Sequence, residues 1–340
     1  MSDNLITITR EQLNALLSIG KATGETKPPL PGDTMPYPSY LLQWLDKASL
    51  RNDWSPKTYE TYKGLIVNHI QPYFDGVMLS HITLDMLESF QQEKMNILSR
   101  ATLEKMQSCI LKNSLKRAVR LHYIDKNPAQ ELEGIKVKNK TKRALKDDEL
   151  ETLIRVSSAH RLGFTVPLLF STGMRRAELL GLTWDDVDFK ALTISINKDY
   201  VSTSKSCFLR DTKTDGSNRV CAIPPSLANI LRNIKETEGH TYVVSQLKQD
   251  KRVDPNNYSR LFRKWCVQAN LKGVSGHSLR VMYCTISSEL GVDNNTIRRQ
   301  IGHTSERMLL THYLKFRTDA AQKDAALRMD SYLNSRLYVS

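Results

Sequence analysis

The sequence has no long apolar stretch. No run among its 340 residues approaches the ~18 apolar residues that a membrane-spanning helix needs. The amino terminus, MSDNLITITREQ, carries an acidic residue early and lacks the basic-then-apolar pattern of a secretory signal. We therefore expect a cytoplasmic protein that has no membrane partner.

Cysteine is scarce, and the motifs of common cofactor sites are missing. The cysteines are odd in number and form no Cys-x-x-Cys pair, so we expect reduced thiols, mostly in the core. No Cys/His spacing typical of zinc and no Gly-x4-Gly-Lys-Ser/Thr phosphate loop occurs. The sequence therefore predicts neither a metal nor another cofactor. The five cysteines are Cys109, Cys207, Cys221, Cys266 and Cys284.

Acidic residues are outnumbered by basic ones. The sequence has 49 Lys and Arg against 36 Asp and Glu, which gives a formal net charge of +13. An excess of this size indicates a polyanionic partner, most simply nucleic acid, although a basic protein without such a partner has the same composition. With 40% hydrophobic and 25% charged residues, the chain is typical of soluble globular proteins.

Hydrophobic periodicity predicts a mainly α protein with a small antiparallel β-sheet, an α+β fold in two domains. Residues 1–35 form a short amino-terminal segment that ends in a proline-rich linker. A helical domain covers 36–131, a basic linker 132–144 and a mixed α/β domain 145–316. A tail helix follows over 317–340, and it packs either on its own chain or on a second copy.

Local signals place several element boundaries. Ser55-Pro56 is typical of a helix start, and Asn127-Pro128 is expected to close the last helix of the first domain. In the second domain, LTISI has the pattern of a strand. CFLRDTKTDGSNRVCAIP predicts a hairpin with Asp215-Gly216 at its turn.

The segment GIKVKNKTKRAL carries a cluster of basic residues with little apolar content. This composition indicates either a strap that runs along DNA phosphates or a plain solvated linker. The candidate DNA-binding residues are Lys136, Lys138, Lys140, Lys142 and Arg143.

Acidic residues cluster in WDDVDF, at Asp185, Asp186 and Asp188. A metal-dependent nuclease would use such carboxylates, but it would need further ligands from elsewhere in the chain. A solvated turn between a helix and a strand has the same composition, and we favour that interpretation.

Six basic or hydroxyl side chains could together transfer a phosphoryl group without a metal. Each alone is an ordinary residue: a surface lysine, a histidine at a helix start or a half-buried tyrosine. As a set they combine guanidinium forks for phosphate oxygens, proton donors and a nucleophile. The set consists of Arg175, Lys213, His277, Arg280, His303 and Tyr313.

The order of these residues resembles the tyrosine recombinase family, also called phage integrases. STGMRRAELLGLTWDDVDF is similar to the family's first box, TKTDGSNRVCAIP to its lysine hairpin and GHSLR to its His-x-x-Arg box. IGHTSERMLLTHYL resembles its last box, a Gly-His with a tyrosine about ten residues on. The boxes cover about Leu145 to Leu314, and the helical region 37–131 resembles the family's core-binding domain.

The resemblance implies roles around the scissile phosphate. Arg175 and Arg280 would clamp the phosphate, and His303 would donate a further hydrogen bond to it. Glu178 would orient the site without doing chemistry. Arg176 falls where the family varies, and we expect a helix-start or DNA-facing residue there.

The resemblance also implies the covalent steps. Tyr313 would attack phosphorus and form a 3′-phosphotyrosyl link, Lys213 would protonate the departing 5′ oxygen, and His277 would assist proton transfer at the tyrosine. By resemblance the protein is a site-specific DNA recombinase that integrates or excises a mobile element.

Two other functions are compatible with the same residues. A chromosome or plasmid dimer resolvase of the same family shares the chemistry. The resemblance implies a C-shaped clamp with one domain on each side of the duplex, and a non-catalytic DNA-binding protein could retain that clamp. The family implies a homo-tetramer on double-stranded DNA, with accessory DNA-bending or directionality proteins as further partners, and a nucleoid-associated location.

Overall fold

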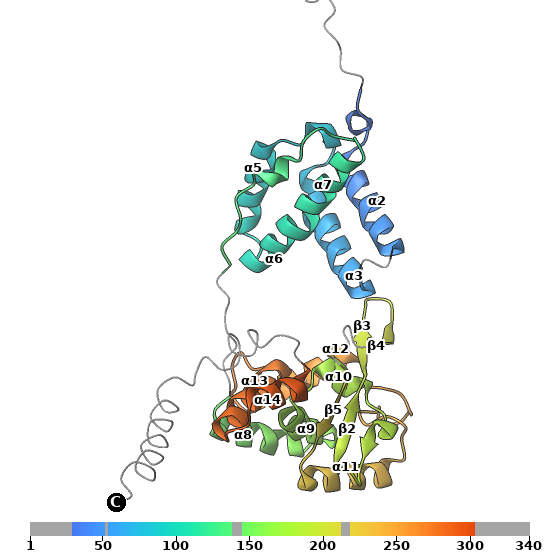
Figure 1. Ribbon diagram of the computed structural model, residues 1–340, viewed down its shortest axis with the longest axis vertical. Helices are drawn as coiled ribbons and strands as arrows, with labels where there is room; N and C mark the ends of the chain where they lie inside the picture. The colour runs from blue at the N-terminus through green and yellow to red at the C-terminus, as the bar shows by residue number, and fades with distance from the viewer. Residues whose placement is uncertain (1–28, 52–53, 138–144, 212–217, 303–340) are drawn as a thin grey trace, which may run out of the picture. The chain divides into compact units, whose positions relative to one another are not determined.

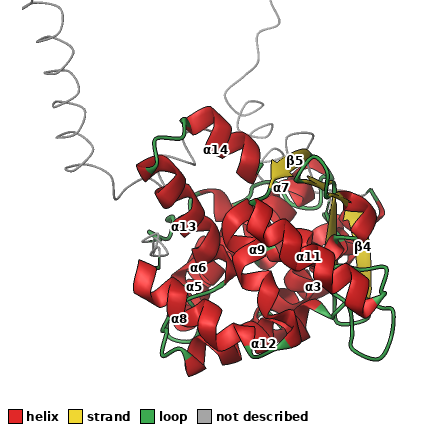
Figure 2. Cartoon of the chain, turned by 90° about the horizontal axis from the view of Figure 1, so that it is seen from below, coloured by secondary structure: helices red, strands yellow, loops and turns green. Residues whose placement is uncertain are grey.

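The computed structural model describes residues 29–51, 54–137, 145–211 and 218–302, and the chain divides into two compact units (Figure 1). The amino-terminal unit is Met1–Lys138 and the carboxy-terminal unit Asn139–Ser340. Helices dominate, and the few strands lie together on one side of the second unit (Figure 2). These observations confirm the predicted fold class. The division falls within 132–144, the segment that the sequence assigns to the linker.

The amino-terminal unit is built from helices joined by short connections. Two of its helices contain a π-helical stretch, so that α3, η2 and α4 are continuous, as are α6, η4 and α7. Its elements are η1 (Pro31–Asp33), α2 (Tyr37–Leu50), α3 (Pro56–Leu65), η2 (Ile66–Ile70), α4 (Gln71–Tyr73), η3 (Leu79–His81), α5 (Leu84–Met95), α6 (Arg100–Lys105), η4 (Met106–Leu111), α7 (Lys112–Arg120) and η5 (Pro128–Gln130).

Side-chain caps and an aromatic core explain these helices. Ser55 caps α3 by accepting the backbone N–H of Thr58, with Pro56 at the first helical position, so the predicted helix start is confirmed. The rings of Tyr37, Phe74 and Phe90 pack on one another in the core, and all three are fully buried. Tyr37 meets Phe74 edge-on and Phe74 meets Phe90 at a tilt, and such ring contacts add to the stabilisation that the buried area provides.

The last helix of this unit ends earlier than predicted. Helix α7 ends at Arg120, whereas Asn127-Pro128 starts the 3₁₀ turn η5, with the Asn127 side chain accepting the N–H of Ala129. The chain leaves α7 through His122, whose φ is +56°, so the helix has ended before the proline is reached.

The first residues of the predicted linker pack on the amino-terminal unit. Leu132 and Ile135 are buried in its core. The Gln107 side-chain amide donates to the carbonyl oxygens of Leu132, at 3.2 Å, and Glu133, at 2.8 Å. The chain is thus tied to the helices at least as far as residue 135.

The carboxy-terminal unit combines helices with two small sheets. Helix α11 begins at Pro225, with Pro224 at its N-cap. The elements are α8 (Asp147–Ser158), η6 (Arg161–Phe164), α9 (Thr165–Thr172), α10 (Arg176–Gly181), η7 (Trp184–Asp186), β1 (Val187–Asp188), β2 (Thr193–Ile196), β3 (Lys198–Ser202), β4 (Cys207–Asp211), β5 (Arg219–Ala222), α11 (Pro225–Glu238), α12 (Pro255–Gln268), α13 (Gly276–Glu289) and α14 (Asn294–Ile301).

Strand pairing in the carboxy-terminal unit differs from the predicted hairpin. Strand β4 pairs with β3, and β5 pairs with β2, so β4 and β5 lie antiparallel to successive parts of residues 193–202. The turn lies between β3 and β4, where the N–H of Thr203 donates to the carbonyl of Ser206. The predicted pairing of the two strands that flank Asp215-Gly216 is therefore wrong, and the cross-strand pairs Tyr200–Leu209 and Val201–Phe208 join β4 to β3 instead. Asp215-Gly216 itself lies outside the described residues.

The core of this unit holds helices α9, α12 and α13 together. Leu168 and Leu169 of α9 and Leu279 of α13 are fully buried. Tyr258 of α12 is also buried, and its hydroxyl donates to Thr165 Oγ1 at 2.8 Å. Burial raises the pKa of this phenol, which therefore stays protonated and can donate. The hydrogen bond fixes the start of α9, the helix that leads into the Arg-Arg segment.

All five cysteines are free thiols. Cys221, Cys266 and Cys284 are buried, whereas Cys109 and Cys207 are partly exposed. Within the described ranges, no helix is long and apolar enough to cross a bilayer.

Replacing Tyr258 with Phe should lower the free energy of unfolding by about 1 kcal/mol, because a buried hydrogen bond is lost while the ring is kept. Tyr59→Phe is the matched control, since its hydroxyl donates to Asp46 in an exposed bond and its loss should change little. Urea unfolding followed by circular dichroism measures both, and equal losses in the two variants would contradict the role of burial.

Candidate functional site

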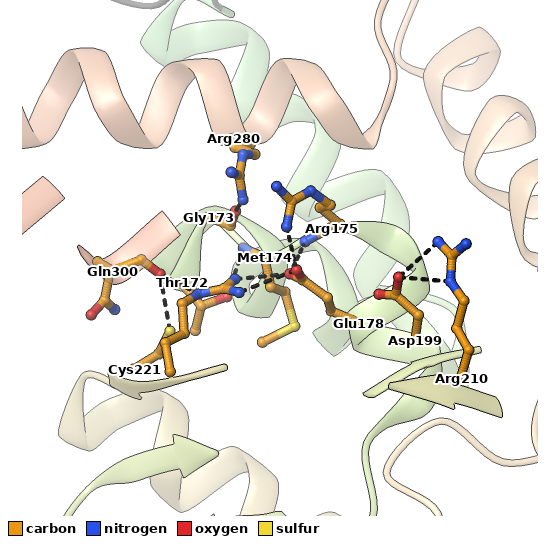
Figure 3. Close-up of polar contacts among 11 residues, drawn as sticks. Thr172, Gly173, Met174, Arg175, Glu178, Asp199, Arg210, Cys221, Arg280 and Gln300 are labelled. Atoms are coloured by element: carbon orange, nitrogen blue, oxygen red, sulfur yellow. Dashed lines mark hydrogen bonds and ion pairs between the residues drawn. The ribbon is translucent and has the colours of Figure 1, made fainter. Parts of the chain in front are cut away.

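Arg175 stands at a sharp turn between α9 and α10. Helix α9 ends at Gly173, which has a left-handed backbone with φ +61°. A Cβ there would lie 2.8 Å from a methyl carbon of Ile301 and 2.9 Å from the ring of Tyr283, so no larger residue fits. The turn places Arg175 at the N-cap of α10, with its side chain 42% exposed (Figure 3).

Glu178 is the buried carboxylate of this turn. Its side chain is fully buried, and it lies one helical turn after Arg175. Oε2 accepts the backbone N–H of Arg175 at 2.6 Å, and Oε1 accepts the Arg175 guanidinium at 2.6 Å (Figure 3). One carboxylate thus holds both the main chain and the side chain of Arg175.

Arg219 of β5 pairs with the same carboxylate. Its Nη1 donates to Glu178 Oε1 at 3.1 Å and its Nη2 to Oε2 at 2.8 Å, a two-pronged contact. Burial alone would raise the pKa of Glu178, but the hydrogen bonds and charge of Arg219, together with Arg175, hold that pKa below its usual value. The carboxylate is therefore ionised at neutral pH.

Arg280 reaches the same turn from α13. It is 1% exposed, and its Nη1 donates to the carbonyl oxygen of Gly173 at 2.6 Å (Figure 3). Two arginines that are 105 positions apart in the sequence thus meet at residues 173–175. Within the described residues, Arg175, Glu178 and Arg280 are the predicted site residues that the structure brings together.

His277 lies on the first turn of α13, three residues before Arg280. It is exposed, whereas Arg280 is buried, so the two side chains differ in their access to solvent. Arg176, as expected, is the first residue of α10, and its guanidinium donates to the hydroxyl of Ser259.

Several predicted site residues lie outside the described part of the chain. They are Lys138, Lys140, Lys142, Arg143, Lys213, His303 and Tyr313. Of the basic segment, Lys136 alone is described, and its side chain is exposed. The predicted roles of all these residues remain predictions.

Arg219 is a member of the buried cluster around Glu178, and the sequence analysis missed it. It lies in the quoted segment SNRVCAIP, but nothing local distinguishes it from a surface arginine. The available signal was in its partner, Glu178, which directly precedes Leu179-Leu180 on an apolar helix. A carboxylate that is buried on such a helix needs a cation beside it.

The acidic cluster serves the local fold. Asp186 accepts the N–H and hydroxyl of Thr183 and pairs with Lys198 Nζ at 2.9 Å. Asp188 accepts the backbone N–H groups of Lys190 and Ala191. Across the described ranges, no group of His, Cys, Asp and Glu side chains is arranged to hold a metal ion. These contacts favour the turn interpretation of WDDVDF.

Glu178→Gln should destabilise the carboxy-terminal unit most at neutral pH. Because the folded-state pKa of Glu178 is depressed, its ionised form stabilises the fold above the ordinary glutamate value of 4.5, and this contribution is lost as the pH falls below it. Thermal melts from about pH 7 to about pH 3 should show the gap between wild type and variant closing on acidification.

The exposed Glu236 provides the control for this experiment. Glu236→Gln should leave the melting temperature close to wild type at every pH. A gap for Glu178→Gln that is independent of pH would show that the ionised carboxylate does not contribute the expected stability.

Comparison with known families supports the sequence resemblance. Residues 143–319 match the model of the phage integrase family, and residues 37–95 match that of the phage integrase N-terminal SAM-like domain. The ICEBs1 integrase of Bacillus subtilis (strain 168) is 24% identical, over 87% of this chain and 83% of the relative. The integrase of Staphylococcus phage L54a is 23% identical, over 89% and 92%.

Solved integrase structures share the fold. The Tn1549 transposon integrase, in complex with a circular intermediate DNA, superposes with a TM-score of 0.72 at 17% identity, over 84% of this chain and 98% of that one. A lambda integrase tetramer bound to a Holliday junction gives 0.64 at 18% identity, over 90% and 87%. Because one family model alone matches more than half of the sequence, the chain belongs to the phage integrase family of tyrosine-type site-specific DNA recombinases.

Proposed function

We propose that this protein cuts and rejoins DNA strands at specific sites through a 3′-phosphotyrosyl intermediate, and thereby integrates or excises a mobile element. The observation that carries the proposal is the exposed Arg175 guanidinium, which a buried carboxylate holds in one orientation. A fixed cation at the surface of a buried polar cluster is suited to a phosphodiester that carries negative charge.

The charge of the cluster supports a phosphate ligand. Glu178 is one carboxylate among three guanidinium groups, those of Arg175, Arg219 and Arg280. The surplus is positive, as stabilisation of a pentacoordinate phosphorus with additional negative charge requires. Arg175 and Arg280 clamp the phosphate in this proposal. Arg280 is buried, so the bound DNA must replace some of the protein atoms that cover its guanidinium.

The remaining steps use residues assigned by family resemblance. The Tyr313 hydroxyl attacks phosphorus, the bond to the 5′ oxygen breaks, and Lys213 gives that oxygen a proton. His277 assists the proton transfer, and His303 donates a hydrogen bond to the phosphate. A 5′ hydroxyl from a second strand then reverses the reaction, so the phosphotyrosyl link retains the energy needed for rejoining.

The partners follow from this chemistry. Strand exchange between two sites needs two double-stranded DNAs and four nucleophiles, so we propose a homo-tetramer on DNA. The basic segment from Lys136 to Arg143 contacts phosphates along the duplex. Accessory DNA-bending or directionality proteins and a nucleoid-associated, cytoplasmic location complete the proposal.

A covalent-trapping assay tests the function. Wild type is incubated in EDTA with labelled DNA from beside its own gene, stopped with SDS and examined for a slow band that proteinase collapses. We expect the band in wild type and its absence in Tyr313→Phe, because the nucleophile is lost. Cleavage that EDTA abolishes, or that survives in Tyr313→Phe, would overturn the proposal.

Arg175→Ala and Arg280→Ala extend the same assay. Each should lower the yield of the covalent complex by about 100-fold or more, while largely sparing DNA affinity, because the charge that builds at phosphorus is no longer neutralised. A loss of affinity as large as the loss of cleavage would count against a catalytic role.

Lys142→Ala tests the basic segment. Removing one phosphate contact should weaken binding to all sequences and reduce the slope of log affinity against log salt by about one. Binding titrations at several salt concentrations measure the slope. An unchanged slope would support the plain-linker interpretation of 132–144.

A further inference from the structure

The mechanism above gives no step to Arg219, which is a buried cation. Arg219 nevertheless contacts two separate parts of the site, Glu178 and the end of α14. We propose that Arg219 is a positioning residue for strand cleavage, which orients Arg175 through Glu178 and holds the end of α14 at the same point. The inference rests on the proposed function. It adds a residue that neither our sequence analysis nor the family boxes assigned.

The hydrogen bonds of Arg219 fix both ends of its guanidinium. The two Nη groups occupy both oxygens of Glu178, and Nε donates to the backbone carbonyl of Gln300 at 2.7 Å. Its side chain is 5% exposed, and all three of its guanidinium nitrogens already donate to protein acceptors. Arg219 therefore acts through its neighbours.

Glu178 transmits this constraint to Arg175. Each carboxylate oxygen accepts one bond from Arg219 and one from Arg175. Without Arg219, the carboxyl group keeps only the partners on its own helical turn and can rotate about its terminal torsion, which is broad and shallow. The exposed guanidinium of Arg175 would then lose its single orientation.

The end of α14 rests directly on Arg219. Gly302 has φ +65°, and a Cβ built there would lie 2.8 Å from Arg219 Nη1 and 3.1 Å from its Cδ. The Cys221 thiol also donates to the Gln300 carbonyl, at 3.1 Å. His303 follows Gly302 directly in the sequence. Arg219 is thus the shared support of the turn that carries Arg175 and of the segment that leads into the last box.

Arg219→Met tests the assignment on two substrates. One carries a normal phosphodiester at the scissile position, and the other a methylphosphonate, in which a methyl group replaces one charged oxygen. Single-turnover covalent-complex formation is measured on both, together with DNA affinity. A substrate without the negative charge has little need of an oriented Arg175.

We expect Arg219→Met to slow cleavage of the phosphodiester by about 10- to 100-fold, with DNA affinity near wild type. On the methylphosphonate the same variant should lose less than about 3-fold relative to wild type. Equal losses on both substrates, or no loss on the phosphodiester, would overturn the assignment.

Arg161→Met is the matched control. Arg161 also joins a carboxylate to a main-chain carbonyl, since it donates to Glu238 at 2.5 Å and to the carbonyl of Ser245. It should reduce stability without distinguishing the two substrates. A wild type that forms no covalent complex with any DNA would remove the proposed function itself, which is a different outcome from equal losses.

A double variant keeps the test valid if Arg219→Met folds poorly. Arg219→Met with Glu178→Gln removes both buried charges at once, so no carboxylate is left with a missing partner. It should still show the substrate-dependent loss, because Arg175 has lost its anchor. Wild-type cleavage by this variant would overturn the assignment.

Gly302→Ala tests the contact at α14 without changing any charge. It should slow phosphodiester cleavage by about 10-fold or more, because the new methyl group displaces the guanidinium. Gly239→Ala is the control, since Gly239 ends α11 with a matching φ of +62° and has open space around it. Equal effects of the two variants would show backbone strain alone and contradict the contact.

Discussion

The pairing of the buried Glu178 carboxylate with two arginines is the interaction on which the site depends. A carboxylate removed from water is costly unless it is paired and fully hydrogen-bonded. Here four N–H donors surround it, two from a residue on its own helical turn and two from a distant strand. The charge is therefore stable only when the carboxy-terminal unit has assembled completely.

This dependence links the geometry of the site to the fold. Arg175 and Glu178 are local partners, but Arg219 comes from the edge of a sheet and Gly302 from the end of a later helix. Arg280 adds a long-range tie of its own to the carbonyl of Gly173. Buried polar contacts of this kind specify one arrangement of elements, since every alternative leaves a charge unpaired.

The sequence predicted the parts of this site whose partners lie close together. Arg175 and Glu178 are three residues apart, so one motif contained both. Arg219 was missed because its contact with Glu178 spans 41 positions and neither residue is unusual in its own segment. Only a three-dimensional arrangement shows that the two charges share one buried space.

The strand pairing shows a similar limit. The sequence analysis missed the turn between β3 and β4, because Thr203 and Ser206 are hydrogen-bonded there without glycine or asparagine to mark the turn. Cross-strand apolar pairs join β4 to β3, and such pairs lie too far apart in sequence for a local turn signal to reveal them. The roles of Lys213, His303 and Tyr313 are predicted from the resemblance alone, because their segments lie outside the described residues.

The tie between Gln107 and the carbonyls of Leu132 and Glu133 has a consequence for DNA binding. Val137 also packs on the core of the amino-terminal unit, and about eight peptide steps separate it from Leu145 in the core of the other unit. At about 3.5 Å per step these span at most about 28 Å. For two binding surfaces joined by a tether of this length, the effective concentration of the second surface after the first has bound is on the order of millimolar. Two surfaces tethered in this way bind one duplex more tightly than either surface does alone.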